Sequence, residues 1–272
     1  MLFPPERFRG PGRLELTVDY DFDLKFRCDL SSYIEWSVFF LGQYGHPTAR
    51  VIKFLLSVGD RAIDVGANVG VYTLIMAKAV GRAGRVAAFD ANPEVYPRLL
   101  QNLALNDFLS RSETYGFALS SLTGTQRLHL PDKASWNRGT ATLIGQTRAD
   151  KHAIEVRVET LDKALGKWER CDLIKIDTDG SDFAVLEGAT EIIERFRPSL
   201  IFEFDKDLWP NAESNRKKVA QELERLGYSF FFIDQRWGRI REIGSAAFPK
   251  GNILALPARR KIAFSQFRPD RT

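Results

Sequence analysis

Residues 61–80 read RAIDVGANVGVYTLIMAKAV: a short apolar run, a turn with two glycines, and a segment with helical spacing. The apolar run predicts a buried strand, and the segment after the turn predicts a helix. Asp64, Gly66, Asn68 and Gly70 fall at the turn, where glycine lets the backbone approach a ligand without interference from a Cβ atom. A strand, a tight turn and a helix in this order are typical of ligand sites in α/β proteins.

The same alternation of strand and helix continues along the chain. Further strands are expected at residues 86–90, 112–120, 171–177, 199–205, 230–234, 238–243 and 252–257. Further helices are expected at 93–106, with Asn92 as its cap, at 183–196, and at 213–226, closed by Gly227. Short β segments between residues 120 and 171 predict a β-rich insertion. The whole pattern predicts a Rossmann-like α/β fold, a mostly parallel twisted sheet with helices on both faces.

The chain is expected to have one main domain with additions at both ends. Of its 272 residues, 44% are hydrophobic and 27% charged, which is ordinary for a globular protein. Residues 1–57 predict an irregular or β-rich extension that could act as a lid, with a hairpin where residues 13–30 alternate. Residues 58–257 form the main domain, and residues 258–272 a basic tail. A solvated tail is favoured over one that binds an anionic surface.

Composition also bears on location and partners. The net charge of +4 is too small to indicate nucleic acid binding by itself. The first residues lack a basic segment followed by an apolar run, and no apolar stretch approaches the roughly 20 residues of a membrane span. Only two cysteines occur, Cys28 and Cys171, which suits a reducing compartment. We therefore expect a cytoplasmic protein without an integral membrane segment.

The glycine turn departs from the pattern that a nicotinamide dinucleotide requires. A nicotinamide dinucleotide calls for the pattern G-x-G-x-x-G, but residues 66–70 read GANVG. Asn68 occupies the place of the glycine that would admit the pyrophosphate, and Asp64 puts a carboxylate near the phosphates. Asp90, twenty residues after Gly70, suits ribose hydroxyls in either class. The alternative without a ligand is a plain tight turn, with Asp90 capping the next helix.

Carboxylates gather where the predicted strands end. They are Asp64, Asp90, Asp177, Asp179, Asp182 and Glu203. Such a rim attracts a cation. S-adenosylmethionine carries an ammonium and a sulfonium and no phosphate, so the rim favours this cofactor over NAD or NADP.

Four motifs extend this interpretation. They are AIDVGANVGVYTLIMA, VAAFDANPEVYPRLLQNLALND, DLIKIDTDGSDFAVLEGA and PSLIFEF, in this order. Together they resemble the FkbM family of S-adenosylmethionine-dependent methyltransferases, over roughly residues 28–257. The family usually has glutamate where this chain has Asp90, Asp179 and Asp182, so the charge is kept with a shorter reach.

The resemblance implies a class I methyltransferase fold and methyl transfer, usually to an oxygen of a sugar or a polyketide-like natural product. It also implies the cofactor site. The methionine part is expected at Asp64, Gly66, Ala67, Asn68 and Gly70, the ribose at Asp90 and Ala91, the adenine at Ala118 and Leu119, and the meeting point of donor and acceptor at Asp177.

Three residues are catalytic candidates: Asp177, His46 and Lys175. His46 is the best candidate for a base because its segment could fold over the cofactor, although a structural role is more common for a lone loop histidine. Lys175 is either an ion partner near the core or a group that orients the acceptor. Glu35 and Tyr44 could close the methionine site or simply pack. Trp136, Asn137 and Arg138 in the insertion would suit a sugar ring or an acidic group, although Trp136 could equally belong to the core.

The segment KIDTDGSD, residues 175–182, could hold a divalent metal through its carboxylates. Capping of the next helix by Asp179 and Ser181, with Asp182 favoured by the helix dipole, is preferred, and no metal site is predicted. A small-molecule or glycan acceptor is expected, and a nucleic acid is not. The alternatives are an NAD(P)-dependent oxidoreductase and an inactive, methyltransferase-like binding module.

Overall fold

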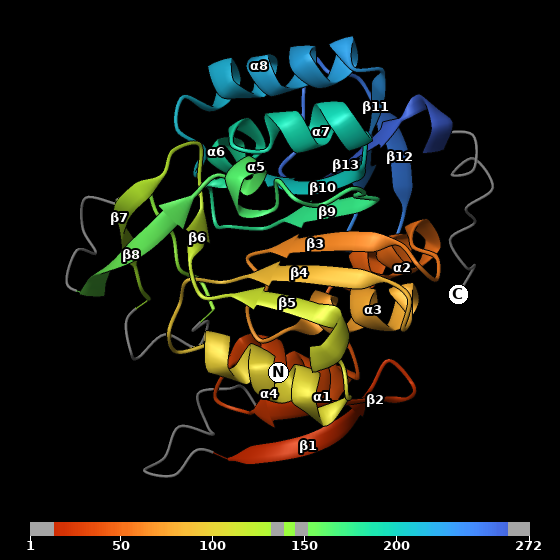
Figure 1. The fold of residues 1–272 in the computed structure, drawn as a ribbon, viewed down its shortest axis with the longest axis vertical. Helices are drawn as coiled ribbons and strands as arrows, with labels where there is room; N and C mark the ends of the chain where they lie inside the picture. Colours follow the sequence, from red (N-terminus) through yellow and green to blue (C-terminus); the bar gives the residue numbers. More distant parts are fainter. Residues whose placement is uncertain (1–13, 132–138, 145–151, 261–272) are drawn as a thin grey trace.

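The computed structural model describes residues 14–131, 139–144 and 152–260 (Figure 1). Eight strands form its central sheet: β3 (Arg61–Val65), β4 (Arg85–Phe89), β5 (Ser112–Tyr115), β9 (Leu173–Ile176), β10 (Ser199–Phe204), β11 (Tyr228–Ile233), β12 (Ile240–Ile243) and β13 (Gly251–Pro257). Their order is β12-β11-β13-β10-β9-β3-β4-β5. The chain runs from β3 outward through β4 to β5 and then returns to the other side of β3 as β9. This reversal between β3 and β9 is where α/β sheets bind ligands.

The sheet is mostly parallel, as expected. β3 pairs in parallel with β4 and β9, and the pairs β4–β5 and β9–β10 are parallel too. β13 lies between β10 and β11 and is antiparallel to both, and β12 is antiparallel to β11. The carboxyl ends of β3, β4, β9 and β10 therefore meet at one edge of the sheet.

Helices cover both faces of the sheet (Figure 1). They are α3 (Val71–Val80), α4 (Tyr96–Leu105), the 3-10 turn Leu109–Arg111, α5 (Leu161–Ala164), α6 (Asp182–Glu187), α7 (Thr190–Phe196) and α8 (Ala212–Arg225). Neighbouring strand residues face opposite cores: Ala62 packs with residues of α3 and α4, whereas Ile63 and Val65 pack with residues of α5 to α8. This alternation follows from the period of two along a strand.

Two predicted helices have different limits in the structure. The helix expected at 93–106 begins at Tyr96, because the Asn92 side-chain oxygen accepts from the Glu94 backbone N–H at 3.0 Å and holds a turn before it. The helix expected at 183–196 is divided into α6 and α7. Between them lies Gly188, where an added Cβ would be 2.1 Å from the Ser120 carbonyl oxygen, so the chain there passes close to the end of the third predicted strand.

The lead segment contains the expected hairpin, β1 (Glu15–Tyr20) and β2 (Leu24–Asp29). The expectation of irregular or β-rich structure up to residue 57 is wrong for the rest, which forms α1 (Tyr33–Leu41) and α2 (His46–Leu55). The apolar residues of α1 show little helical periodicity, which conceals the helix. In α2, buried residues do recur at helical spacing, at Thr48, Val51, Ile52 and Leu55.

The lead segment belongs to the same core as the main sheet. Phe26, Leu30 and Ile52 lie in one buried cluster with Leu74 of α3 and Leu99 of α4. The Arg98 side chain of α4 also forms ion pairs with Glu35 of α1 and Glu15 of β1. Glu35 is therefore engaged in holding α1 to α4, which is the packing alternative expected for it.

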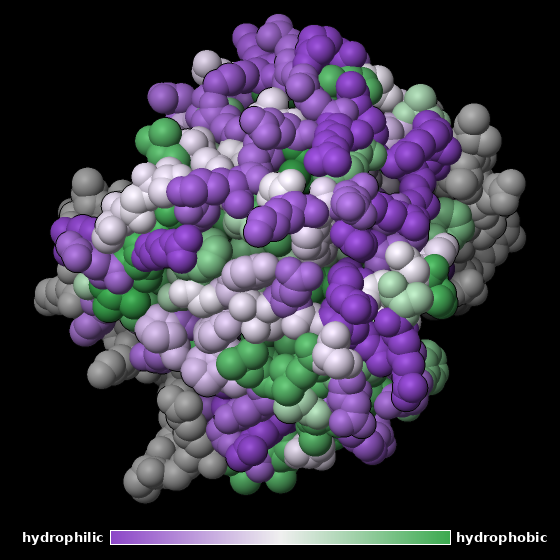
Figure 2. All heavy atoms as spheres, viewed as in Figure 1, coloured by the Kyte–Doolittle hydropathy of each residue, from purple (hydrophilic) through white to green (hydrophobic). Residues whose placement is uncertain are grey.

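The β-rich insertion is confirmed. Its strands β7 (Gly124–His129) and β8 (Ala153–Glu159) form a small sheet of order β6-β8-β7 with β6 (Ala118–Leu119). β6 is the end of the strand expected at 112–120, which is divided into β5 and β6. Thr142 adds a β-bridge to His129. Figure 2 shows polar side chains over most of the visible face, with apolar ones in smaller groups. Within the described ranges, no helix has the length and apolar character needed to cross a membrane.

Candidate active site

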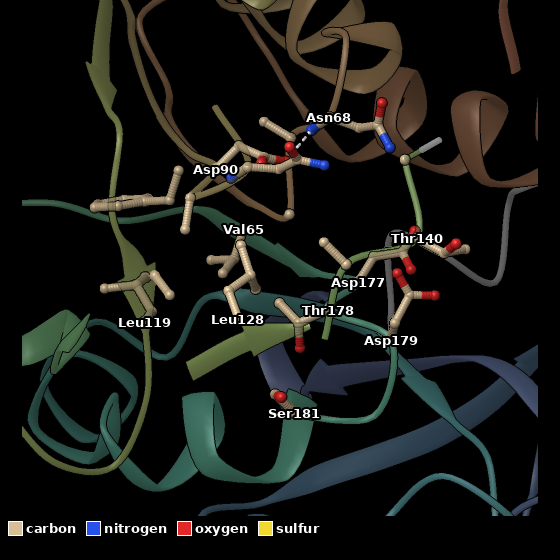
Figure 3. A pocket seen from close by; sticks show the side chains of 18 of the residues that line it. Val65, Asn68, Asp90, Leu119, Leu128, Thr140, Asp177, Thr178, Asp179 and Ser181 are labelled. Atoms are coloured by element: carbon tan, nitrogen blue, oxygen red, sulfur yellow. Dashed lines mark hydrogen bonds between the residues drawn. The ribbon is translucent and has the colours of Figure 1, made fainter. Parts of the chain in front are cut away.

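A pocket opens at the carboxyl ends of β3, β4 and β9, at the reversal of strand order (Figure 3). It encloses about 960 Å³ of empty space, its open mouth included. Nine of the predicted site residues line it: Gly66, Ala67, Asn68, Asp90, Ala91, Ala118, Leu119, Lys175 and Asp177.

The glycine turn has a shape that only glycine allows at Gly66. Its φ is +72°, and an added Cβ would lie 1.8 Å from the Asp177 carbonyl oxygen. The N–H groups of Gly66 and Ala67 both donate to the Phe89 carbonyl at 3.0 Å, which ties the turn to the end of β4. Asn68 is also left-handed, with φ +52°, a conformation that asparagine tolerates. The turn therefore brings β3, β4 and β9 together at the floor of the pocket.

Asp90 is held in place by two backbone groups. Its Oδ2 accepts from the Asn68 N–H at 2.8 Å (Figure 3). Its Oδ1 accepts from the Asn92 N–H at 2.9 Å. Burial raises the pKa of Asp90 to about 6, although both hydrogen bonds oppose the shift. The carboxylate lies in the pocket wall beside the glycine turn, with a fixed orientation toward a ligand.

One side of the pocket is apolar. Val65, Phe89, Phe117, Leu119 and Leu128 line it, and Figure 3 shows Leu119 on the far side of the pocket from Asp179. Phe89 stacks on Tyr115 with ring centroids 4.5 Å apart, which fixes the aromatic wall. An apolar surface of this kind suits an aromatic base.

Lys175 lies on the opposite side with its charge already engaged. Its Nζ is 3.1 Å from Asp177 Oδ2, 3.5 Å from Asp64 Oδ1 and 4.8 Å from the centre of the Tyr72 ring. Burial alone would lower the pKa of Lys175, but the charges of Asp177 and Asp64 raise it above its usual value. Lys175 therefore stays protonated, and it is an ion partner of both carboxylates.

Three predicted site residues are not among those that line this pocket. Asp64 has no exposed surface, and its Oδ2 accepts from the Thr73 hydroxyl at 2.6 Å behind Lys175. Gly70 caps the start of α3 with φ +96°. His46 is the first residue of α2, while its neighbour Tyr44 does line the pocket. Sequence reasoning missed Ile34 and Tyr72, although Tyr72 follows the turn directly.

The loop after β9 forms the acidic end of the pocket. Asp182 is fully buried and accepts from the Thr178 hydroxyl at 2.9 Å and from the Glu203 N–H at 3.1 Å. Ser181 occupies the N-cap position of α6 but makes no capping hydrogen bond with its side chain. Capping by Asp179 and Ser181 side chains is therefore wrong, because Asp182 fixes the loop and leaves Asp179 and Ser181 to the pocket wall.

The carboxylates at this end repel one another. Burial first, and then the charge of Asp177, raise the pKa of Asp179 to about 8, of Glu203 to about 7 and of Asp182 to about 6. In the part of the chain that the structure describes, no three or more His, Cys, Asp or Glu residues are grouped so that they could hold a metal ion.

The insertion completes the wall. Gly139, Thr140, Ala141 and Leu143 line the pocket, and the Thr142 hydroxyl donates to the Asp179 carbonyl at 2.8 Å. A Cβ on Gly139 would lie 1.9 Å from Asn68 Nδ2, so the insertion touches the glycine turn. The predicted contacts of Trp136, Asn137 and Arg138 lie outside the described residues.

The strand order and the pocket at its reversal define a Rossmann-like α/β fold, a class that binds its ligands at this place. Residues 64–230 match the family model described as the methyltransferase FkbM domain. Because the match covers more than half of the chain, the protein belongs to the FkbM methyltransferase family. The match and the strand order together confirm the Rossmann-like methyltransferase fold that the sequence predicts.

Individual relatives are more distant. The methyltransferase sdnD of Sordaria araneosa is 29% identical over 177 residues, which are 50% of this chain and 66% of that protein. The match thus covers slightly less than two thirds of this relative.

Among solved structures, the methyltransferase FkbM from Methylobacillus flagellatus KT is similar with a TM-score of 0.47 and 15% identity, over 72% of this chain and 43% of that one. An O-methyltransferase from Bacillus cereus in complex with SAH has a TM-score of 0.46 and 15% identity, over 78% of this chain and 80% of that one. A putative rRNA-methylase from Clostridium thermocellum has a TM-score of 0.46 and 11% identity, over 78% of this chain and 94% of that one.

Proposed function

We propose that this protein is an S-adenosylmethionine-dependent methyltransferase. The observation that carries the proposal is the charge of the pocket wall. Among the described residues that line it, three acidic side chains, Asp90, Asp177 and Asp179, accompany one ammonium, that of Lys175, which is already paired with Asp64 and Asp177. A wall with excess negative charge favours a ligand that carries a sulfonium and an ammonium.

The residues present fit this cofactor part by part. Because Gly66 has no Cβ, the Asp177 backbone can approach the glycine turn closely, so residues 66–68 and Asp177 lie together in the wall, where they would meet the methionine part. Asp90 and Ala91 would hold the ribose, because a fixed carboxylate can accept from two hydroxyls. Ala118 and Leu119, with the apolar wall, would cover the adenine. When bound, the cofactor supplies an electrophilic methyl group on a positively charged sulfur.

The same wall disfavours a dinucleotide. A pyrophosphate needs backbone donors and room beside the glycine turn. Asn68 stands there instead, with its side-chain amide packed against Gly139 and its side-chain oxygen accepting from the Val69 N–H at 2.8 Å. Asp177, which also lines the pocket, would repel the phosphates. These features support the methyl donor over NAD or NADP.

We infer that the acceptor is a hydroxyl group of a small molecule, such as a sugar or a secondary metabolite. Thr140, Thr178 and Ser181 supply hydroxyls at the acidic end, which suits hydrogen bonding to a polyhydroxylated compound. A nucleic acid ranks lower, because the carboxylates there would repel its phosphates. Asp177 and Lys175 remain the candidates for orienting the acceptor, and a role of His46 as the base remains a prediction.

The test is the thermal midpoint with S-adenosylhomocysteine, NAD or NADP, each at saturation. Binding at a hundred times the dissociation constant adds about 2.7 kcal/mol of stability, which is worth several degrees for a chain of this size. We expect a rise with S-adenosylhomocysteine alone. A rise with NAD or NADP instead would contradict the proposal. Methyl transfer from labelled S-adenosylmethionine to a panel of hydroxylated compounds then separates an enzyme from an inactive binding module.

A further inference from the structure

Asp179 differs from the other acidic residues of the pocket because its carboxylate has no protein partner. Asp90 accepts two backbone N–H groups, and Asp177 pairs with Lys175 at 3.1 Å. Asp182, just behind the wall, accepts from Thr178 and from Glu203. Asp179 lines the pocket, is half-buried, and has neither a hydrogen bond nor an ion pair to its side chain among the described residues.

A second side chain in the same wall also lacks a partner. Ser181 is 5% exposed, and its hydroxyl makes no hydrogen bond within the described residues. A buried hydroxyl that faces a pocket without a partner is expected to bind a polar atom of a ligand. The Thr142 hydroxyl meanwhile fixes the backbone of Asp179 from the insertion. Asp179 and Ser181 thus belong to a preformed polar end of the pocket.

The charges around Asp179 determine its state in the empty pocket. Asp177, Asp182 on α6 and Glu203 on β10 repel its negative form, while Lys175 attracts it only weakly because two other carboxylates engage it. From the described part of the lead segment, the neutral hydroxyl of Tyr44 interacts with it electrostatically, and residues 139–144 of the insertion carry no charge. Burial and these like charges raise the pKa of Asp179 to about 8, so it holds a proton near pH 7.

We propose that Asp179 loses its proton when the positively charged methyl donor binds, and that its carboxylate then accepts the proton of the acceptor hydroxyl during methyl transfer. This rests on the proposed function. A cation bound in the pocket compensates Asp177 and Glu203, so it favours the ionised form of Asp179. The product S-adenosylhomocysteine lacks the sulfonium charge, so its binding does not favour the ionised form of Asp179.

The proposed step balances in atoms and charge. A lone pair of the acceptor oxygen forms the new O–C bond, and the electrons of the broken C–S bond stay on sulfur. The electrons of the O–H bond stay on oxygen, and the proton passes to the Asp179 carboxylate. One positive charge disappears from sulfur as one proton arrives on Asp179. The net charge of this acidic pocket therefore does not change during the reaction.

Binding itself tests the proposal without a known acceptor. Isothermal titration calorimetry at pH 7 in phosphate and in Tris, which differ in ionisation enthalpy, measures the protons released on binding. We expect about one proton more to be released with S-adenosylmethionine than with S-adenosylhomocysteine. Asp179→Asn should abolish this difference while it still binds S-adenosylhomocysteine, which shows that the site is intact.

Asp107→Asn is the matched control. Asp107 is exposed and, like Asp179, has a left-handed backbone, with φ values of +57° and +49°, which asparagine tolerates. The Asp107→Asn variant should leave unchanged the difference in proton release between S-adenosylmethionine and S-adenosylhomocysteine. Equal proton release for the two ligands in the wild type, or a difference that persists in Asp179→Asn and disappears in Glu203→Gln, would overturn the role of Asp179. If neither ligand binds, the proposed function fails as well, and that result is distinct from equal release.

Discussion

At the scale of single residues, Gly66 connects sequence, fold and site most directly. Its left-handed backbone and the 1.8 Å that separates a hypothetical Cβ from the Asp177 carbonyl oxygen leave no other residue type without strain. The same close approach joins β3 to the loop after β9, which carries Asp177, and thereby sets the floor of the pocket. Glycine at this position is therefore required by packing as well as by any ligand.

We expect Gly66→Ala to lower the free energy of unfolding by about 2 to 4 kcal/mol, because backbone strain and a clash with a carbonyl add together. Gly42→Ala is the control, since Gly42 has a similar φ of +69° and open space around its Cβ position. Urea denaturation of both variants measures the two costs. A cost no greater than that of Gly42→Ala would show that the contact with Asp177 can relax.

At the scale of elements, the loop between β9 and α6 concentrates the chemistry. It places Asp177, Asp179 and Ser181 in the pocket wall, while buried Asp182 supports it from behind. The insertion reaches this loop through Thr142 and reaches the glycine turn through Gly139. Three segments distant in sequence therefore form one wall, and the acceptor end of the pocket depends on all of them.

The same loop makes a prediction about pH. The folded pKa values of Asp179, Glu203 and Asp182, about 8, 7 and 6, lie above the unfolded values, so the folded state binds more protons. The stability from this protonation is present in full below the unfolded values and is lost as the pH rises through the folded ones. We expect the unliganded protein to lose at least about 3 kcal/mol of unfolding free energy between pH 5.5 and pH 8, since each group contributes up to about 1.4 kcal/mol per pH unit.

Urea denaturation at the two pH values measures this loss, and Asp179→Asn should reduce it. A stability that rises over the same interval would mean that these carboxylates are ionised throughout and that the repulsion among them is small.

At the scale of the whole molecule, the sequence predicted the sheet, most helices and much of the pocket. Strong hydrophobic periodicity and glycines at the turns predicted the strands and helices around Gly66 and Asp90. Helix α1 was hidden by its nearly uniform apolar residues. The direction of buried polar side chains was also not predictable: Asp64 faces Lys175 and Thr73 behind the pocket, because only the register of β3 against β9 decides its partner. The capping role expected for Ser181 failed because Asp182 fixes the loop instead, which spacing along the sequence does not reveal.

The central claim is that this pocket binds the methyl donor or its product, with Asp90 in its wall. The most direct measurement is a calorimetric titration of S-adenosylhomocysteine into the wild type, Asp90→Asn and the control Asp107→Asn. We predict one site per chain in the wild type and in the control, and binding at least about tenfold weaker in Asp90→Asn, since a charged hydrogen bond to ribose is worth about 1.5 to 3 kcal/mol. No binding by the wild type, or equal binding by Asp90→Asn, would contradict the account.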